Sequence, residues 1–90
     1  MSEFTPKEID RTLGELTAEL QSELSAIAAG FGKMCHNLHK DFHYKLVQAG
    51  VATMKPATDR AGKAIRGFHE MTLTARGRAV ADRMKELANA

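Results

Sequence analysis

Apolar residues recur at helical spacing through the first part of the chain. They occupy Ile9, Leu13, Leu16, Leu20, Leu24 and Ile27, every third or fourth position. Such a repeat lines one side of an α-helix with apolar side chains. Thr5, Pro6 and Glu8 precede the stripe, and they suit a helix N-cap, a first helical position and the acidic position of a capping box. The pattern predicts an N-terminal helix over about residues 5–22.

Glycines interrupt this pattern, and a second helical stretch follows them. Gly30 and Gly32 each weaken a helix interior by about 1 kcal/mol relative to alanine. Helical spacing then resumes at Leu38, Phe42, Leu46 and Val47. It stops at Gly50, a residue type that favours a helix C-terminus, so we expect two helices joined by a turn over about residues 24–49. The alternative is one long helix over residues 5–49, as in a coiled coil, because the apolar stripe keeps its helical phase through the glycines.

In the second half of the chain the pattern changes to alternation. Residues 51–54 suit a short strand, and residues 68–73 alternate in the manner of a second strand. Between them, residues 56–67 are rich in threonine, aspartate, glycine and basic side chains, which is typical of an exposed loop. Thr74 then provides the N-cap of a closing amphipathic helix over about residues 75–88. The predicted fold is mostly α, in the α+β class.

The composition is that of one small folded domain. Ninety residues supply a single hydrophobic core, so we expect one domain over residues 1–90. The chain is 43% hydrophobic and 27% charged, which excludes a disordered polymer. No apolar run approaches the roughly 20 residues that span a bilayer, and the first residues lack the pattern of a secretory signal. Because Cys35 is the one cysteine, no internal disulfide forms, and we expect a cytoplasmic protein without membrane contact.

The charges are unevenly distributed along the chain. Residues 1–30 carry two basic and six acidic side chains, a net charge of −4. Residues 31–78 carry nine basic and three acidic side chains, a net charge of +6, and the last twelve residues balance. A basic middle segment behind an acidic N-terminal segment favours a surface that faces a polyanion.

Two short segments carry a pair of motifs. Residues 45–52 are KLVQAGVA, and residues 73–81 are LTARGRAVA. The first resembles the end of the recognition helix in winged helix-turn-helix repressors of the MarR and ArsR types, and the second resembles their step from the last wing strand into the closing helix. The resemblance covers about residues 24–83 and implies a winged helix-turn-helix fold. In that fold the two-stranded wing spans about residues 51–73, with residues 59–63 at its tip.

The resemblance implies a non-enzymatic transcriptional regulator that binds double-stranded DNA. Its recognition helix would enter the major groove, and its basic wing, with Arg60, Lys63 and Arg66, would contact the backbone. Asn37 is the first candidate to recognise a base, because its amide can pair with adenine through two hydrogen bonds, and Lys40 is the next. The full set of candidate DNA-binding residues is Lys33, His36, Asn37, His39, Lys40, His43, Lys55, Arg60, Lys63 and Arg66.

The N-terminal stripe is long for the core of so small a domain. We expect part of it to form the interface of a homodimer. The residues assigned to this interface are Ile9, Leu13, Leu16 and Leu20. A two-fold symmetric protein would also suit palindromic DNA sites.

Other functions have less support in the sequence. Cysteine and histidines on one helix face would suit zinc or copper, and the residues concerned are Cys35, His36, His39 and His43. One helix rarely supplies three ligands with good geometry, so we expect no metal and no cofactor.

Nucleophile elbows and phosphate-binding loops are absent from the sequence, so no enzymatic activity is expected. The alternative function is a protein–protein interaction module on a winged-helix or coiled-coil scaffold.

Overall fold

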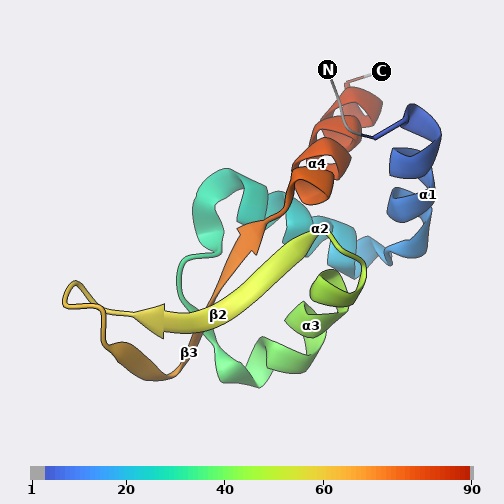
Figure 1. The fold of residues 1–90 in the computed structure, drawn as a ribbon. Helices are drawn as coiled ribbons and strands as arrows, with labels where there is room; N and C mark the ends of the chain where they lie inside the picture. Colours follow the sequence, from blue (N-terminus) through green and yellow to red (C-terminus); the bar gives the residue numbers. More distant parts are fainter. Residues whose placement is uncertain (1–3, 90) are drawn as a thin grey trace.

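The computed structural model describes residues 4–89, which form four α-helices and a three-stranded antiparallel sheet (Figure 1). The helices are α1 (Pro6–Glu15), α2 (Ala18–Ala26), α3 (Lys40–Gln48) and α4 (Ala75–Ala88), and the strands are β1 (Cys35–His36), β2 (Ala52–Thr58) and β3 (Ala64–Leu73). A π-type turn, η1 (Ile27–Phe31), continues α2, and a 3-10 turn, η2 (Asn37–His39), precedes α3. This is the expected α+β class, and residues 1–3 and 90 of the expected domain lie outside the described residues.

A corner between α1 and α2 divides the helix that was expected over residues 5–22. Leu16 is extended, with φ −90° and ψ 133°, and the side chain of Thr17 caps α2. Gln21 Nε2 donates hydrogen bonds to the backbone carbonyls of Leu13 and Leu16, at 3.3 and 3.0 Å. These bonds satisfy carbonyls that the end of α1 leaves without a helical partner. The corner folds the apolar stripe back on itself, so that both halves face one core.

A strand separates the two helices of the expected helix-turn-helix over residues 24–49. α2 ends in η1, where Gly30 adopts a φ of 102°, and the chain then forms β1 before it enters η2 and α3. Gly32 anchors this segment to the sheet, because its carbonyl accepts a hydrogen bond from the Met71 N–H at 2.8 Å. The two helices are therefore not joined by the predicted tight turn. The alternative of one helix over residues 5–49 is also wrong.

β2 and β3 form the hairpin that was expected over residues 51–73. Both strands are longer than predicted, because much of the segment 56–67, which was expected to be a loop, belongs to them. The turn between them is confined to residues 59–63. The pairing register shifts after Pro56, and Gly67 in the facing part of β3 has a φ of 86°, as in a β-bulge.

The core lies where the helices meet the sheet. The strand order is β1-β3-β2, α3 packs on β2, and α4 packs on β3 and also on α1. In Figure 1, α1 and α4 lie together at the end of the molecule away from the hairpin turn. The buried side chains of the main cluster are Ile9, Leu16, Leu20, Leu24, Ile27, Leu46, Val51, Ala52, Met71 and Val80.

This core accounts for the apolar stripe that was assigned to a homodimer interface. Ile9, Leu16 and Leu20 are 5–6% exposed, and Leu13 is half-buried against them. The corner between α1 and α2 brings these residues to the core of the same chain. Because Ile9, Leu16 and Leu20 are buried there, their assignment to an interface between two copies is wrong. The homodimer itself stays a prediction.

The hairpin makes the molecule elongated. Its principal extents are 41 × 26 × 23 Å, and its radius of gyration is 13.7 Å. A compact chain of this length has a radius of gyration of about 12 Å. Figure 1 shows the turn of the hairpin projecting beyond the helices. Within residues 4–89, no helix is both long enough and apolar enough to cross a membrane.

Candidate functional site

α3 has one face in the core and one in solvent. Leu46 is fully buried, and Phe42 and Val47 are half-buried against the core. The exposed face consists of Lys40, Asp41, Tyr44, Lys45 and Gln48. Of these five residues only Lys40 was among the predicted DNA contacts, because the prediction began the helix too early and placed Leu38 in the core. Leu38 lies in η2 and is 83% exposed.

Nine of the ten residues predicted to contact DNA are exposed, but several lie outside α3. The predicted DNA contacts that precede α3 in the chain are Lys33, His36, Asn37 and His39. Asn37, Lys40 and Lys55 line one shallow pocket between the start of α3 and β2. The structure therefore brings three of the predicted residues together from three elements, η2, α3 and β2.

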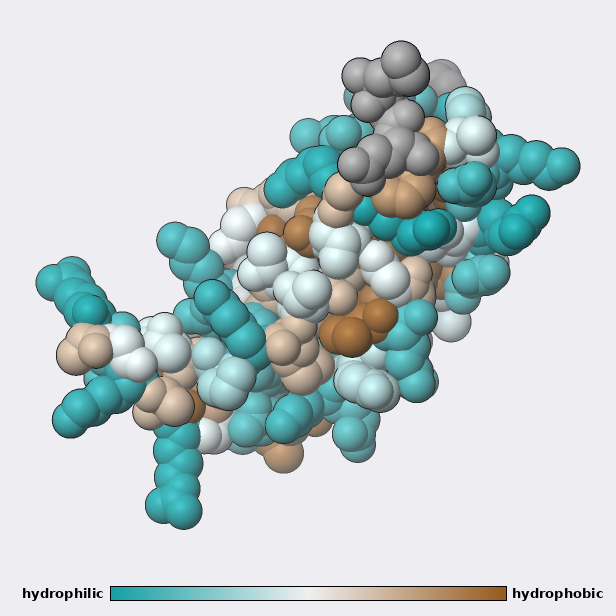
Figure 2. All heavy atoms as spheres, in the orientation of Figure 1, coloured by the Kyte–Doolittle hydropathy of each residue, from teal (hydrophilic) through white to brown (hydrophobic). Residues whose placement is uncertain are grey.

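Three cations of the predicted set lie in the turn of the hairpin and at the adjoining start of β3. Arg60, Lys63 and Arg66 are exposed, and none has an ion-pair partner among residues 4–89. Asp59 shapes the turn, because its side chain accepts hydrogen bonds from the backbone N–H groups of Ala61 and Lys63 at 2.9 and 3.0 Å. Figure 2 shows long hydrophilic side chains extending from this end of the molecule.

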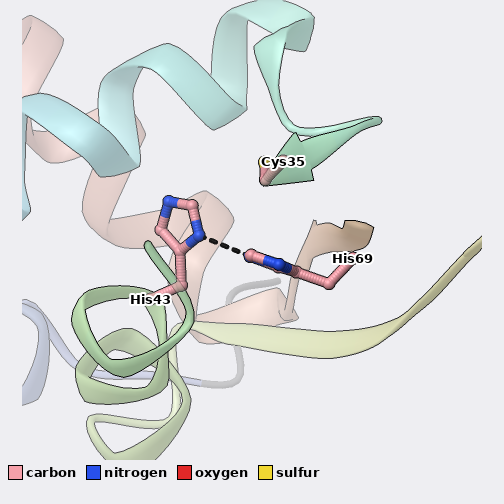
Figure 3. A group of neighbouring side chains, drawn as sticks. All are labelled: Cys35, His43 and His69. Carbon is pink, nitrogen blue, oxygen red and sulfur yellow. Dashed lines mark hydrogen bonds between the residues drawn. The ribbon is translucent and has the colours of Figure 1, made fainter. Parts of the chain in front are cut away.

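A buried polar network lies behind the exposed face of α3 (Figure 3). His43 and His69 are 3% and 2% exposed, and His43 Nδ1 lies 2.7 Å from His69 Nε2. His43 Nε2 donates to Glu23 Oε1 at 3.0 Å, and His69 Nδ1 donates to Asn37 Oδ1 at 2.9 Å. The prediction that His43 contacts DNA is wrong, because α3 turns its ring toward the core. Asn37 is exposed, but pairing with adenine through both amide atoms would compete with its bond to His69.

Burial shifts two pKa values in and beside this network. Burial is the largest cause that lowers the pKa of His69. Electrostatic interactions with His43, Lys40, His39 and His36 lower the pKa of His69 further. Burial also raises the pKa of the Cys35 thiol, with a second contribution from the negative charge of Glu23. Both shifts favour the uncharged form of the side chain.

Three potential metal ligands converge in the same place. Cys35 Sγ and one ring nitrogen from each of His43 and His69 lie within 4.8 Å of one another. No group of this kind within residues 4–89 includes His36 or His39, the other histidines of the one-helix set considered from the sequence. Sequence analysis missed His69, although strand alternation places it on the same side of β3 as the buried Met71.

Comparison with known proteins does not identify a relative. No family model, no curated protein sequence and no solved structure is significantly similar to this chain.

Proposed function

We propose that this protein binds double-stranded DNA, with the exposed face of α3 toward the major groove and the hairpin on the sugar-phosphate backbone. The observation that carries the proposal is the group of three cations, Arg60, Lys63 and Arg66, at the projecting end of the hairpin. They have no acidic partner among the described residues, so they are available to an external polyanion. Phosphate contacts of this kind supply most of the affinity of proteins for DNA.

The dimensions and chemistry of α3 support its role in the groove. An α-helix with its side chains is about 10–12 Å across and so fits the roughly 12 Å width of the major groove, and the nine residues of α3 extend over about 14 Å. Gln48 on its exposed face can form two hydrogen bonds with adenine, and Lys45 can contact a phosphate or guanine. In this arrangement the hairpin supplies affinity and register, while the helix supplies base recognition.

The order of elements supports a relationship to winged helix-turn-helix regulators. α3 leads directly into the β2–β3 hairpin, and the hairpin leads into α4, as the MarR and ArsR resemblance implies. In the proposed function, the chain is a non-catalytic regulator that uses this helix and this wing.

Fluorescence anisotropy with labelled DNA duplexes, measured over a range of salt concentrations, tests the proposal. We expect binding that weakens steeply as salt rises. The triple variant R60A/K63A/R66A loses up to three phosphate contacts, so the slope of log K against log salt should fall in magnitude by about 2.7. Circular dichroism checks that each variant is folded.

The matched control removes three exposed cations at the other end of the molecule. The variant K7A/R11A/K85A has the same change in net charge and alters α1 and α4. We expect its salt slope to stay close to that of the wild type. Equal losses in both triple variants would mean that only net charge matters, and absence of binding at low salt would overturn the proposal.

Binding to another protein is the second candidate, and exposed apolar side chains favour it. Phe31, Met34 and Leu38 lie within one short segment and are 75%, 54% and 83% exposed. Apolar side chains gathered in this way are typical of protein contact surfaces. A partner captured by the wild type and lost with F31S/L38S, in a protein that does not bind DNA, would support this candidate.

A further inference from the structure

We propose that Cys35, His43 and His69 form a binding site for a Zn²⁺ ion. The three side chains come from β1, α3 and β3, elements that lie apart in the sequence and meet at this point (Figure 3). Their donor atoms lie within 4.8 Å of one another. A metal bound there would connect the strand before α3, the helix itself and the central strand of the sheet.

Hydrogen bonds on the outer side of both histidines orient the rings for a metal. Glu23 accepts from His43 Nε2 and Asn37 accepts from His69 Nδ1, at 3.0 and 2.9 Å. A carboxylate and an amide carbonyl can only accept, so these two nitrogens carry the ring hydrogens. Metal-binding histidines in proteins are held in the same way, with the second nitrogen donating to a carboxylate or carbonyl.

The inner nitrogens then face each other with lone pairs. His43 Nδ1 and His69 Nε2 are 2.7 Å apart in a buried setting. In the structure the two nitrogens form a hydrogen bond, which takes one proton between them. A metal ion would take the place of that proton and bind both nitrogens through their lone pairs. Glu23 provides the nearby negative charge.

The distances fit a tetrahedral ion after small side-chain movements. Zinc–nitrogen bonds of about 2.0–2.1 Å place two ligand nitrogens about 3.3 Å apart. The rings, now at 2.7 Å, would therefore separate by roughly 0.6 Å. A zinc–sulfur bond of about 2.3 Å places sulfur about 3.6 Å from each nitrogen. The sulfur–nitrogen separations, which lie within 4.8 Å, would therefore contract by no more than about 1.2 Å.

The donor types suit zinc, and the surroundings provide access. Thiolate and neutral imidazole are both zinc ligands, and three protein ligands leave a fourth position for water. A surface pocket reaches the cluster, and its lining includes Met34, Cys35 and His43. Cys35 is half-buried. On metal binding its thiol proton passes to water, so the bound ion of charge +2 is partly neutralised by the thiolate and by the neighbouring carboxylate of Glu23.

Co²⁺ is the spectroscopic probe that tests the site in the reduced, metal-free full-length protein. We expect one Co²⁺ per chain, with the strong visible absorption of a tetrahedral site and a thiolate-to-cobalt charge-transfer band. One equivalent of Zn²⁺ should remove both signals. The variant C35S should lose the charge-transfer band while its circular dichroism remains that of the folded protein, because Cys35 is not in the buried core.

Two further variants distinguish binding at this site from binding at the exposed histidines beside it. H36Q/H39Q removes those exposed histidines, and we expect its Co²⁺ spectrum and affinity to be unchanged. E23Q weakens the outer hydrogen bond of His43 and should lower the affinity about 10- to 100-fold with the spectrum retained. Absence of stoichiometric Co²⁺ or Zn²⁺ binding would overturn the proposal, as would loss of the spectrum in H36Q/H39Q or its persistence in C35S.

Discussion

At Gly77 the absence of a side chain allows α4 to approach the chain that precedes β2. A Cβ atom at this position would lie 1.8 Å from the carbonyl oxygen of Val51. That carbonyl also accepts a hydrogen bond from the Thr74 N–H, so it is held in place. We expect G77A to lower the free energy of unfolding by more than about 3 kcal/mol, since the clash exceeds the roughly 1 kcal/mol gain in helix propensity. Urea denaturation measures the change.

Gly14 provides the control for the substitution at Gly77. It also lies in a helix, but a Cβ there would have no atom within 4 Å. G14A should raise the free energy of unfolding by about 0.5–1 kcal/mol, because alanine costs less backbone entropy than glycine. If both variants changed stability equally, the close approach at Gly77 would not be the cause.

Single residues also show what the sequence could and could not predict about the site. Arg60, Lys63 and Arg66 were identified correctly as exposed cations of a hairpin, since local composition determines the turn. His43 was assigned to the wrong face because its partner, His69, lies 26 residues away in the chain. A contact of this kind depends on the packing of β3 against α3, which local spacing does not encode.

Helix boundaries were predicted correctly where a capping residue nearby in the sequence determines them. Thr5 and Thr74 accept the predicted hydrogen bonds at the starts of α1 and α4, and α4 has the predicted limits. The corner before α2 was missed because it depends on Gln21, a residue from the next helix, which binds the carbonyls of the first. β1 was missed because two residues carry too little pattern, and its existence depends on pairing with β3.

The exposed face of α3 makes a prediction of its own about the proposed function. If this face lies in the major groove, K45A should weaken binding to all duplexes similarly and reduce the salt slope by about 0.9. Q48A should change the preference between duplex sequences by about 1–3 kcal/mol at one base pair and leave the salt slope unchanged. Anisotropy with a panel of single-base duplex variants measures both effects. Equal behaviour of K45A and the remote control K85A would place the DNA elsewhere.

The charge asymmetry of the sequence becomes a spatial asymmetry in the whole molecule. The acidic first thirty residues include α1 and α2, and α1 lies at the end away from the hairpin turn (Figure 1). At that end Asp10 pairs with Arg83 of α4 at 2.9 Å. Within the hairpin Lys55 pairs with Glu70 at 3.5 Å, whereas Arg60, Lys63 and Arg66 have no ion pair within the described chain. In the proposed complex with DNA, this distribution would direct the hairpin toward the phosphates and the acidic segment away from them.

Removal of zinc should change the stability of the entire domain, because the proposed ligands connect three elements. An ion that binds only the folded state adds about 2.7 kcal/mol when its free concentration is 100 times its Kd. For a domain of this size, that corresponds to a rise of roughly 10–20 °C in Tm. Scanning calorimetry with Zn²⁺ should show the rise in Tm, and a chelator should reverse it.

Two variants serve as controls for this rise in Tm. C35S should show a much smaller rise, whereas H36Q/H39Q should behave as the wild type. The same rise in C35S would mean that zinc stabilises the protein from another site.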